Sequence, residues 1–487
     1  MKTEFLNASP ESLGIPSKAI EEFLDELQEK KLCMHSFILL RHGKIAAEGY
    51  WQPFDAERKH RIYSISKSFT SIAVGMIINE EKLSLDSKVA DFFPEHIPEN
   101  PHPYVLKVTV RDLLMMSSCN SNYPYSSETF ASVGTFFQGT EYKHISGQFF
   151  QYDTVGTDVL CALVEKISGK TLLEYMRPVL DEIGFSKDAY CLKITEGYSW
   201  GGSGIICTPR DLARFALLCM NKGQWNGKQL LNRDFMTAAT SRQIDSSVNG
   251  FGFEGGFGYG YKFWCLRDKG FFMYGMGSQY ALCLPEQDVI LITTADTQGV
   301  DGAGDFIIDR FLRFCEKISD KPLAENHDVH RTLQERTGNL SLPLHEGAAE
   351  TSVSRAISGK KYILDENESG MKWLRFHADS EKYRLEYENG SGTHELIFGT
   401  GHYESFNFPE KYSGKRMRQY DTHYECIGTG AWINERSFLG TVYAIDDYFG
   451  SIKFQLTFTD DEVSGYMLKA AEWFFEEYQG SISGRAV

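Results

Sequence analysis

The chain lacks the long hydrophobic segments that would place it in or across a membrane. Of its 487 residues, 42% are hydrophobic, but the longest apolar runs, such as SIAVGMII, fall well short of the roughly 20 residues that span a bilayer. The first residues, MKTEFLNASPESLG, include acidic side chains and no apolar core, which is not typical of a secretion signal. We therefore expect a cytoplasmic protein that does not bind membranes.

Positive charge is also scarce. Lysine and arginine total 50 against 66 aspartates and glutamates, which gives a formal net charge of −16. A chain this acidic repels phosphate backbones and anionic lipid surfaces. We therefore expect no nucleic acid partner.

Several common motifs are missing. The ten cysteines are scattered singly without a C-x-x-C pair, which argues against a zinc ribbon or a redox dithiol. No H-E-x-x-H and no G-x-S-x-G stretch occurs, and the thirteen histidines show no metal-ligand spacing. The G-x-G-x-x-G match at 250–255 follows no strand and precedes no helix, so it does not predict a dinucleotide site. We expect no metal and no organic cofactor.

The chain is too long for one hydrophobic core, and its composition changes along its length. Helical periodicity at 17–30 is followed by an expected hairpin at 36–51, turning at His42 and Gly43, and the part from about 70 to 195 is mostly helical. Aromatic and β-branched residues then predict successive strands in GYGYKFWCL, GFFMYGMGSQYALCLP and DVILITTAD.

The last third of the chain has a different pattern. Residues 326–355 are polar and weakly patterned, which predicts a linker. Alternating polar and apolar residues in KYRLEYE, HELIFGT and GSIKFQLTFTD then predict a small all-β module, a sandwich or a barrel, over 356–487. The first domain would cover 1–325.

The stretch HRIYSISKSFTS, residues 60–71, is the most informative. It places Ser64 three residues before Lys67, one turn apart on the same face of a helix. The apolar run FTSIAVGMII is able to bury that helix, and a buried lysine favours its neutral form, which can activate a serine hydroxyl for attack. The alternative has equal weight on this stretch alone: a serine N-cap beside a lysine that extends to solvent.

Three separated stretches together resemble one family. They are Ser64-Ile-Ser-Lys67, Tyr152-Asp-Thr154 and Gly275-Met-Gly-Ser-Gln279. Their order and spacing resemble the class C β-lactamase-like serine hydrolases, which include family VIII esterases and penicillin-binding-protein relatives, over roughly residues 10–320. The resemblance implies an α+β fold, with an antiparallel sheet flanked by helices and a helical lobe, here followed by the all-β module.

The resemblance also implies roles for these residues. Ser64 would be the acylated nucleophile, and Lys67 would take or hold its proton. Tyr152 would act as base and then as acid, with Lys67 favouring its phenolate. The oxyanion hole would use the backbone N–H of Ser64 and one from the strand with Met276–Gln279, for which Gln279 is the expected donor. From the residues alone, hydrophobic packing before a helix is the favoured explanation of Tyr152.

Two positions depart from the family pattern and bear on the substrate. Thr154 stands where the family usually has asparagine, and Met276 stands where a lysine or histidine usually binds a substrate carboxylate. Methionine supplies neither charge nor a donor. An uncharged ester or amide therefore suits the site better than a β-lactam, and the aromatic stretches GFGYGYKFWC and GFFMYG suggest an apolar pocket.

The sequence thus favours a serine hydrolase that cleaves an ester or amide through acyl-Ser64, with Thr154, Met276, Gly277, Ser278 and Gln279 around the substrate. A D-amino-acid peptidase or a β-lactamase of the same family is one alternative. A non-catalytic binding protein with a degenerate site is another, motivated by Thr154 and Met276. The expected partner is a small-molecule ester, amide or peptide, and a homodimer is compatible with the sequence.

Overall fold

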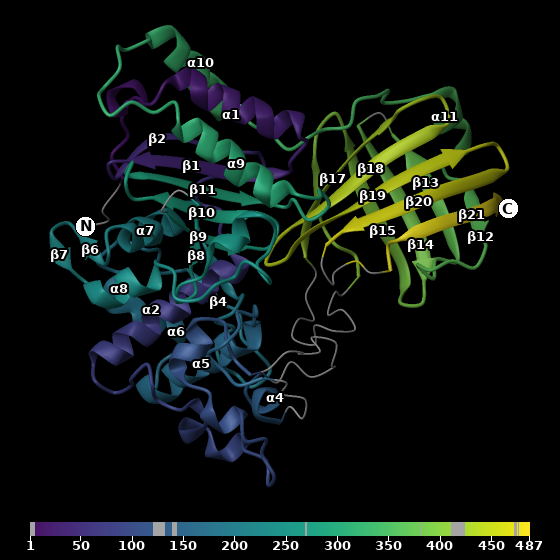
Figure 1. Ribbon diagram of the computed structural model, residues 1–487. Helices are drawn as coiled ribbons and strands as arrows, with labels where there is room; N and C mark the ends of the chain where they lie inside the picture. The colour runs from purple at the N-terminus through teal and green to yellow at the C-terminus, as the bar shows by residue number, and fades with distance from the viewer. Residues whose placement is uncertain are drawn as a thin grey trace. The chain divides into compact units, whose positions relative to one another are not determined.

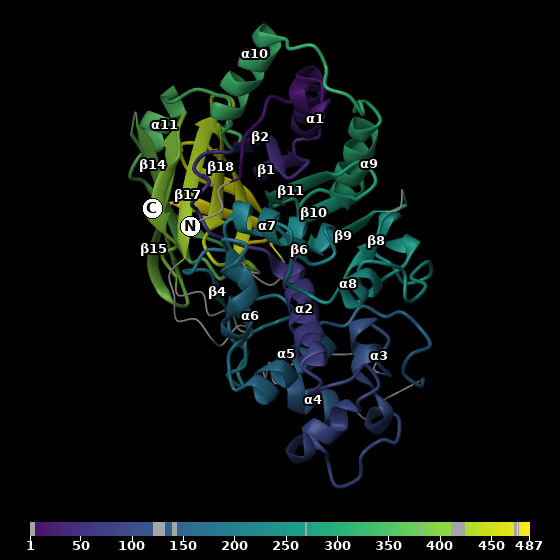
Figure 2. The same cartoon turned by 90° about the vertical axis from the view of Figure 1, so that its left-hand side faces the viewer.

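The computed structural model describes residues 5–119, 132–138, 144–267, 270–379, 381–410, 424–471, 475 and 477–487. The chain divides into two compact units, Met1–Leu342 and Pro343–Val487. Helices and sheet make up the first unit, whereas the second is nearly all strand (Figures 1 and 2).

A six-stranded antiparallel sheet organises the first unit, with strand order β2-β1-β11-β10-β9-β8. The strands are β1 (Met34–Arg41), β2 (Lys44–Tyr50), β8 (Trp264–Cys265), β9 (Phe271–Gly275), β10 (Gln279–Leu284) and β11 (Val289–Ala295). β1 is buried along its whole length, as is typical of a strand whose sheet is covered on both faces. The predicted hairpin is confirmed, because β1 and β2 pair up to Arg41 and Lys44.

Helices cover both faces of this sheet. On one face α1 (Ser17–Glu29) contacts α9 (Ala303–Cys315) and α10 (His327–Gly338). On the other face α7 (Pro209–Met220) packs against β1, β10 and β11. Figure 1 shows α1 and α10 on the side of the sheet opposite to α7.

The predicted helical region begins with α2 (Ser66–Asn79), which packs against α5 (Thr154–Ser168). Gly169, with φ of 69°, ends α5 as the sequence predicts. The other helices here are α3 (Val110–Leu114), α4 (Ser132–Gln138), α6 (Leu172–Leu180) and α8 (Arg233–Ala239). Short strands between them are β3 (His60–Arg61), β4 (Tyr190–Cys191), β5 (Ile205–Cys207), β6 (Gln224–Trp225) and β7 (Lys228–Gln229).

Two strand predictions were wrong in detail. Residues 270–285, expected as one strand, form the β9–β10 hairpin, because Gly277 and Ser278 adopt positive φ values of 80° and 69° and reverse the chain. The strand expected over 258–266 is reduced to β8. Lys262, with φ of 66°, interrupts the extended backbone just before it.

The stretch 326–355 differs from the expected linker because it contains two helices. In α10 only Leu333 is buried, while Arg336 donates to the Glu21 carbonyl at 3.0 Å and pairs with Asp25 at 2.8 Å. The helix therefore docks through charged contacts and leaves little hydrophobic periodicity in the sequence. The second helix, α11 (Ser352–Ile357), follows a capping box at Thr351.

The second unit is a β-barrel, one of the two predicted alternatives. Its sheet has the order β15-β14-β13-β12-β21-β20-β19-β18-β17-β16, and a parallel β15–β17 pairing closes it. The strands are β12 (Lys361–Leu364), β13 (Trp373–Ala378), β14 (Lys382–Asn389), β15 (Gly392–Thr400), β16 (Glu404–Asn407), β17 (Glu425–Trp432), β18 (Ser437–Ile445), β19 (Phe449–Phe458), β20 (Glu462–Ala470) and β21 (Gly480–Ala486). Phe376, Tyr383, Trp432 and Phe438 pack ring to ring in its core. Within the described ranges, no helix has the length and apolar character to cross a bilayer.

Two buried histidines connect the central sheet of the first unit to the segment before Ser64. Nδ1 of His35 on β1 lies 2.8 Å from Nε2 of His60 on β3, and Nδ1 of His60 lies 2.8 Å from the Arg61 carbonyl. Because a carbonyl only accepts, His60 donates to it and His35 donates to His60. Burial lowers the pKa of both imidazoles, to about 3 for His60.

We therefore expect the unfolding free energy to fall as the pH drops below about 6.5, since the unfolded chain then binds protons that the native imidazoles exclude. The loss should approach about 1.4 kcal/mol per pH unit for each imidazole. Urea unfolding between pH 7 and pH 5 measures it. His60→Gln should flatten this slope. An equal slope in the wild-type and His60→Gln proteins would contradict the prediction.

Candidate active site

The turn that carries Ser64 has a strained backbone. Tyr63, Ser64 and Ile65 form a 3-10 turn that leads directly into α2. Tyr63 has φ of 46°, which a bulky residue adopts only where its surroundings enforce it. The Arg61 guanidinium lies 4.5 Å from the Tyr63 ring centroid and 4.6 Å from that of Trp200. These contacts hold the backbone that presents the partly exposed Ser64 side chain.

The small polar side chains of α2 attach it to two neighbouring loops. The first two turns of the helix are fully buried, so each hydroxyl needs a partner. The bonds join Ser66 to Ile205, Thr70 to Gly201, Ser68 to Lys262 and Ser71 to Tyr261, all through backbone groups at 2.6 to 3.1 Å. The unusual SISKSFTS composition therefore fixes the loops on both sides of the Ser64–Lys67 pair.

Lys67 contacts Ser64 directly. Its side chain is 1% exposed, and its Nζ lies 2.9 Å from Ser64 Oγ and 2.6 Å from the Gly202 carbonyl oxygen. The Gly202 N–H donates to Asp158 Oδ1 at 2.8 Å, which holds that carbonyl in position. The alternative of a lysine extending to solvent is wrong for this residue.

Tyr152 completes the contacts around Ser64. Its phenol hydrogen-bonds with the Ser64 hydroxyl, and Lys67 Nζ lies 5.0 Å from its ring centroid. Burial raises the pKa of Tyr152, and the hydrogen bond to Ser64 opposes this only in part. The direction is opposite to the phenolate expected from the sequence. Whether Tyr152 acts as base or as acid stays a prediction.

The turn Met276–Ser278 lies next to the Ser64 turn. A Cβ on Gly275 would come within 2.2 Å of the Ile62 carbonyl oxygen, so the end of β9 directly abuts the chain that leads to Ser64. Gln279 anchors the turn through its side chain. Its Nε2 donates to the Met276 and Ala295 carbonyls at 2.8 and 2.6 Å, and its Oε1 accepts from Ala295 N–H at 3.0 Å.

The remaining predicted site residues flank this arrangement. Ser278 Oγ lies 2.6 Å from Thr297 Oγ1, so this hydroxyl is engaged within the sheet. Thr154 is the first residue of α5 and sits against the Gly202 loop, where its methyl group lies 2.6 Å from the position of a Cβ on Gly202. The structure thus brings the predicted site residues together around the Ser64 turn. They are Lys67, Tyr152, Thr154 and the turn at 276–279. The oxyanion role of the Gln279 N–H stays a prediction.

A cavity of about 180 Å³ is lined by two of the rings that pack against Tyr152. The Tyr152 ring packs against Phe251 and stacks on Trp264, with centroids 4.7 and 5.7 Å apart, and both of these line the cavity. Its other aromatic walls come from the central sheet: Phe272, Tyr274 and Tyr280. Trp264, Phe272 and Tyr274 come from the stretches GFGYGYKFWC and GFFMYG, but Glu254 and Asp305 also line the cavity, so the expected apolar pocket stays a prediction. Sequence reasoning did not identify Phe251.

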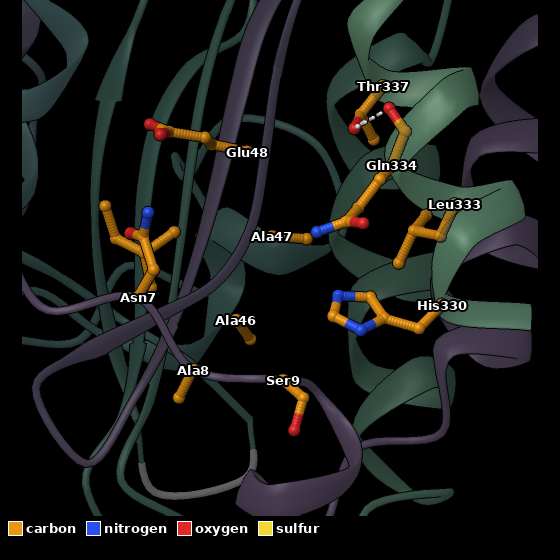
Figure 3. Close-up of a pocket in the computed structure, with 11 residues that line it drawn as sticks. Asn7, Ala8, Ser9, Ala46, Ala47, Glu48, His330, Leu333, Gln334 and Thr337 are labelled. Atoms are coloured by element: carbon orange, nitrogen blue, oxygen red, sulfur yellow. Dashed lines mark hydrogen bonds between the residues drawn. The ribbon is translucent and has the colours of Figure 1, made fainter. Parts of the chain in front are cut away.

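A second cavity, of about 310 Å³, lies between the N-terminal segment, β2 and α10 (Figure 3). Polar side chains of Asn7, Ser9, His330 and Gln334 surround it. None of the residues predicted for the site lines it. Across the described ranges, no group of three His, Cys, Asp or Glu side chains is placed to bind a metal.

Sequence reasoning missed two buried charges beside the site, Asp153 and Lys262. Asp153 caps α5 through Gly156 N–H at 3.0 Å and accepts from Ser118 Oγ at 3.1 Å. Lys262 belongs to the aromatic run GYGYKFW, where a lone lysine among large apolar residues was the available signal.

Comparisons with known proteins agree with this architecture. The sequence model of the Beta-lactamase family matches residues 28–311. The 6-aminohexanoate-dimer hydrolase of Paenarthrobacter ureafaciens is 24% identical over 294 residues, 55% of this chain and 74% of that protein. Protein flp of Staphylococcus aureus (strain COL) is 24% identical over 166 residues, 31% of this chain and 33% of that protein.

A solved structure shares the fold of the first unit. It is a putative 6-aminohexanoate-dimer hydrolase from Bacillus anthracis, with a TM-score of 0.52 and 17% identity, and the match covers 65% of this chain and 89% of that one. The predicted fold class is confirmed: a β-lactamase/transpeptidase-like α+β domain followed by an all-β domain.

The contact between Gly202 and Lys67 is testable. In Gly202→Ala the new Cβ would lie 2.6 Å from the Thr154 methyl and 2.8 Å from Asp158 Oδ1, so we expect the backbone at 202 to shift and its carbonyl contact with Lys67 to weaken. Because small misplacements at a reacting site are costly, we expect acylation of Ser64 by a fluorophosphonate to slow by roughly 10- to 100-fold. Gly338→Ala, where the Cβ would meet open space, is the control. Unchanged labelling of Gly202→Ala would contradict the assigned role.

Proposed function

The chain belongs to the Beta-lactamase family of serine hydrolases, and on that premise we propose that it cleaves an ester or amide bond through an acyl-Ser64 intermediate. The observation that carries the proposal is the double contact at Ser64. Its hydroxyl lies 2.9 Å from the buried Lys67 amine and bonds with the Tyr152 phenol. Such an arrangement of nucleophile, base and acid is what acyl transfer requires.

The proposed steps assign one proton movement to each group. Ser64 Oγ attacks the substrate carbonyl carbon while neutral Lys67 accepts the hydroxyl proton. The oxyanion receives hydrogen bonds from the Ser64 N–H and, as a second donor, the Gln279 N–H. As the bond to the leaving group breaks, Tyr152 gives its proton to the departing oxygen or nitrogen and regains one from Lys67. Water then adds to the acyl group and releases the acid and free Ser64.

The raised pKa of Tyr152 supports this division of roles. A phenol that keeps its proton through neutral pH is a competent acid, and we assign the acceptor role to the Lys67 amine, which lies 2.9 Å from Ser64 Oγ. We therefore replace the phenolate base inferred from the family resemblance with a Lys67 base and a Tyr152 acid.

We infer an uncharged ester or a linear amide as the substrate class. Met276 brings no charge to the turn beside Ser64. The rings of Phe251 and Trp264, which pack against Tyr152, line a cavity whose walls also include the carboxyl side chains of Glu254 and Asp305. One relative is named a hydrolase of the 6-aminohexanoate dimer, and a dimer of an amino acid is joined by an amide. D-Amino-acid peptides and β-lactams are the alternative substrates within the family. We further propose that the enzyme is cytoplasmic, works without a cofactor and needs no nucleic acid or membrane partner.

The first test is covalent labelling of the purified protein by a fluorophosphonate, measured as intact mass. We expect one adduct on wild type, none on Ser64→Ala, and labelling slowed by about 100-fold or more in Lys67→Met, since general-base assistance contributes 10²- to 10⁴-fold. Lys317→Met, which removes an exposed ion pair with Glu22, is the matched control. No adduct on wild type would favour the non-catalytic alternative, and an adduct on Ser64→Ala would exclude Ser64 as the nucleophile.

The substrate class is tested at Met276. Replacing it with lysine places a cation beside the Ser64 turn, so Met276→Lys should raise kcat/KM for carboxylate-bearing substrates, such as a cephalosporin, relative to a neutral p-nitrophenyl ester. We expect the ratio of the two to rise by roughly ten-fold, the size of one charge-assisted hydrogen bond. Met276→Gln, which adds a polar group without charge, is the control. An unchanged ratio would remove Met276 as the reason for excluding β-lactams.

A further inference from the structure

The cavity lined by Phe251 and Trp264 has no part in the steps proposed above. Its volume of about 180 Å³ is below the roughly 300 to 1,000 Å³ of pockets that enclose a whole drug-sized ligand. Four of its twelve lining residues are glycines, which place no side chain in the space: Gly252, Gly255, Gly302 and Gly304. The cavity therefore has room for one end of a small molecule.

Five aromatic rings form a continuous series along the cavity. Trp264 packs against Phe251 and Phe272, with ring centroids 5.6 and 6.0 Å apart. Tyr280 packs against Phe272 and Tyr274 at 6.1 and 5.1 Å. Apart from Phe251, the rings come from β8, β9 and β10, where the register pairs them across neighbouring strands. Aromatic rings pack against apolar groups, and their faces also attract cations.

The charge at this cavity is negative. Among the described residues that line it, Glu254 and Asp305 carry charge and none is cationic. Glu254 is 2% exposed and pairs with Arg267 at 3.3 Å. The same guanidinium pairs with Asp309 at 3.2 Å, so one cation is shared between two carboxylates.

Asp305 adds a carboxylate that is held by hydrogen bonds. Its oxygens accept the N–H groups of Phe253 and Glu254 at 3.0 and 3.3 Å, which orients it from the first turn of α9. The described part of the chain places no lysine, arginine or histidine within ion-pair distance of it. The amide of an asparagine could accept the same N–H groups, so the loop does not account for the negative charge.

Tyr152 relates the cavity to the reaction. Its phenol bonds with the Ser64 hydroxyl, while its ring packs against Phe251 and Trp264 at 4.7 and 5.7 Å. In the proposed steps Tyr152 gives its proton to the leaving group, so the leaving group lies on the Tyr152 side of Ser64. The part of the substrate next to the cavity is then the leaving group rather than the acyl group.

We propose that this cavity is a subsite for an ammonium group carried by the leaving group, with Glu254 and Asp305 supplying the complementary charge. The proposal rests on the proposed function and narrows its substrate class: Met276 offers no cation to a substrate carboxylate, and the leaving group itself brings a positive charge. The ammonium group takes no part in bond cleavage, which follows the steps already given.

The first test is calorimetric titration of the wild-type protein at low ionic strength with two alcohols of equal shape. One is choline, and the other is the neutral alcohol in which carbon replaces its nitrogen. We expect choline to bind about ten-fold more tightly, since ring faces and carboxylates both favour the cation. Equal binding of the two alcohols, or no binding of either, would overturn the proposal.

Glu254→Gln and Asp305→Asn keep the size of each side chain and remove its charge. Each should lower the preference for choline by roughly three-fold or more, because one charge near the bound cation is lost. Asp309→Asn is the matched control, since Asp309 pairs with the same Arg267 but does not line the cavity. If both cavity variants are folded by circular dichroism and keep the wild-type preference, or if Asp309→Asn lowers it equally, the proposal fails.

The acetate esters of the same two alcohols connect binding to the reaction. The ratio of their kcat/KM values should favour the choline ester in wild type and should fall in Glu254→Gln and Asp305→Asn. A preference in binding without a preference in kcat/KM would overturn the assignment of the cavity to the leaving group.

The two proposals fail in different ways. Absence of an adduct on wild-type Ser64 overturns the acyl-enzyme mechanism whether or not choline binds, because the titration does not involve Ser64. An adduct on wild-type Ser64 without a preference for choline overturns only the ammonium subsite.

Discussion

The burial of the Lys67 amine against Ser64 Oγ is the interaction on which the rest of the site depends. A lysine taken out of water loses hydration worth several kcal/mol, so the surrounding chain must replace it or let the amine become neutral. The Gly202 carbonyl replaces part of it at 2.6 Å, and the Asp158 carboxylate holds Gly202 through its N–H. A solvated lysine at the same spacing would stay protonated and would not serve as a base at neutral pH.

The need to replace the lost hydration of the buried Lys67 amine explains the composition of α2. A helix buried on every side is usually apolar throughout, yet this one carries serines and a threonine in its first turns. Each of those hydroxyls binds a backbone group of the loops at 201–205 or 261–262. The loops that supply the Lys67 acceptor and the Lys262 backbone are thus positioned by the helix that carries Lys67, so the geometry of the site is built largely from main-chain contacts.

The sequence predicted those parts of the structure that depend on a short local pattern, or on several motifs in a characteristic order along the chain. The hairpin at His42 and Gly43, the end of α5 at Gly169 and the helix after Ser64 each follow from capping, turn or periodicity rules. The pairing of Ser64 with Lys67 and Tyr152 followed from three motifs in a recognisable order. The turn at Met276–Ser278 was missed because hydrophobicity continues through it on both sides, and only two positive φ values interrupt the strand.

Other features left no signal in the sequence. The helix α10 docks through Arg336 and Leu333 rather than through an apolar face, so a linker was the natural prediction. Burial raises the pKa of Tyr152, an influence that the sequence does not show, whereas the neighbouring lysine from which a phenolate was expected is visible in it. Asp153 and Lys262 lie more than a hundred positions apart, and no local pattern connects them.

The Gln279 side chain has a consequence for how this enzyme family can diversify. Its amide bridges the Met276 and Ala295 backbones, so the shape of the turn is set without any contribution from the side chain at 276. That side chain is partly exposed, and replacing it leaves the fold's hydrogen bonds intact. A single base change separates the methionine codon from a lysine codon. Under the proposed role of Met276, substrate charge preference would change in one mutational step.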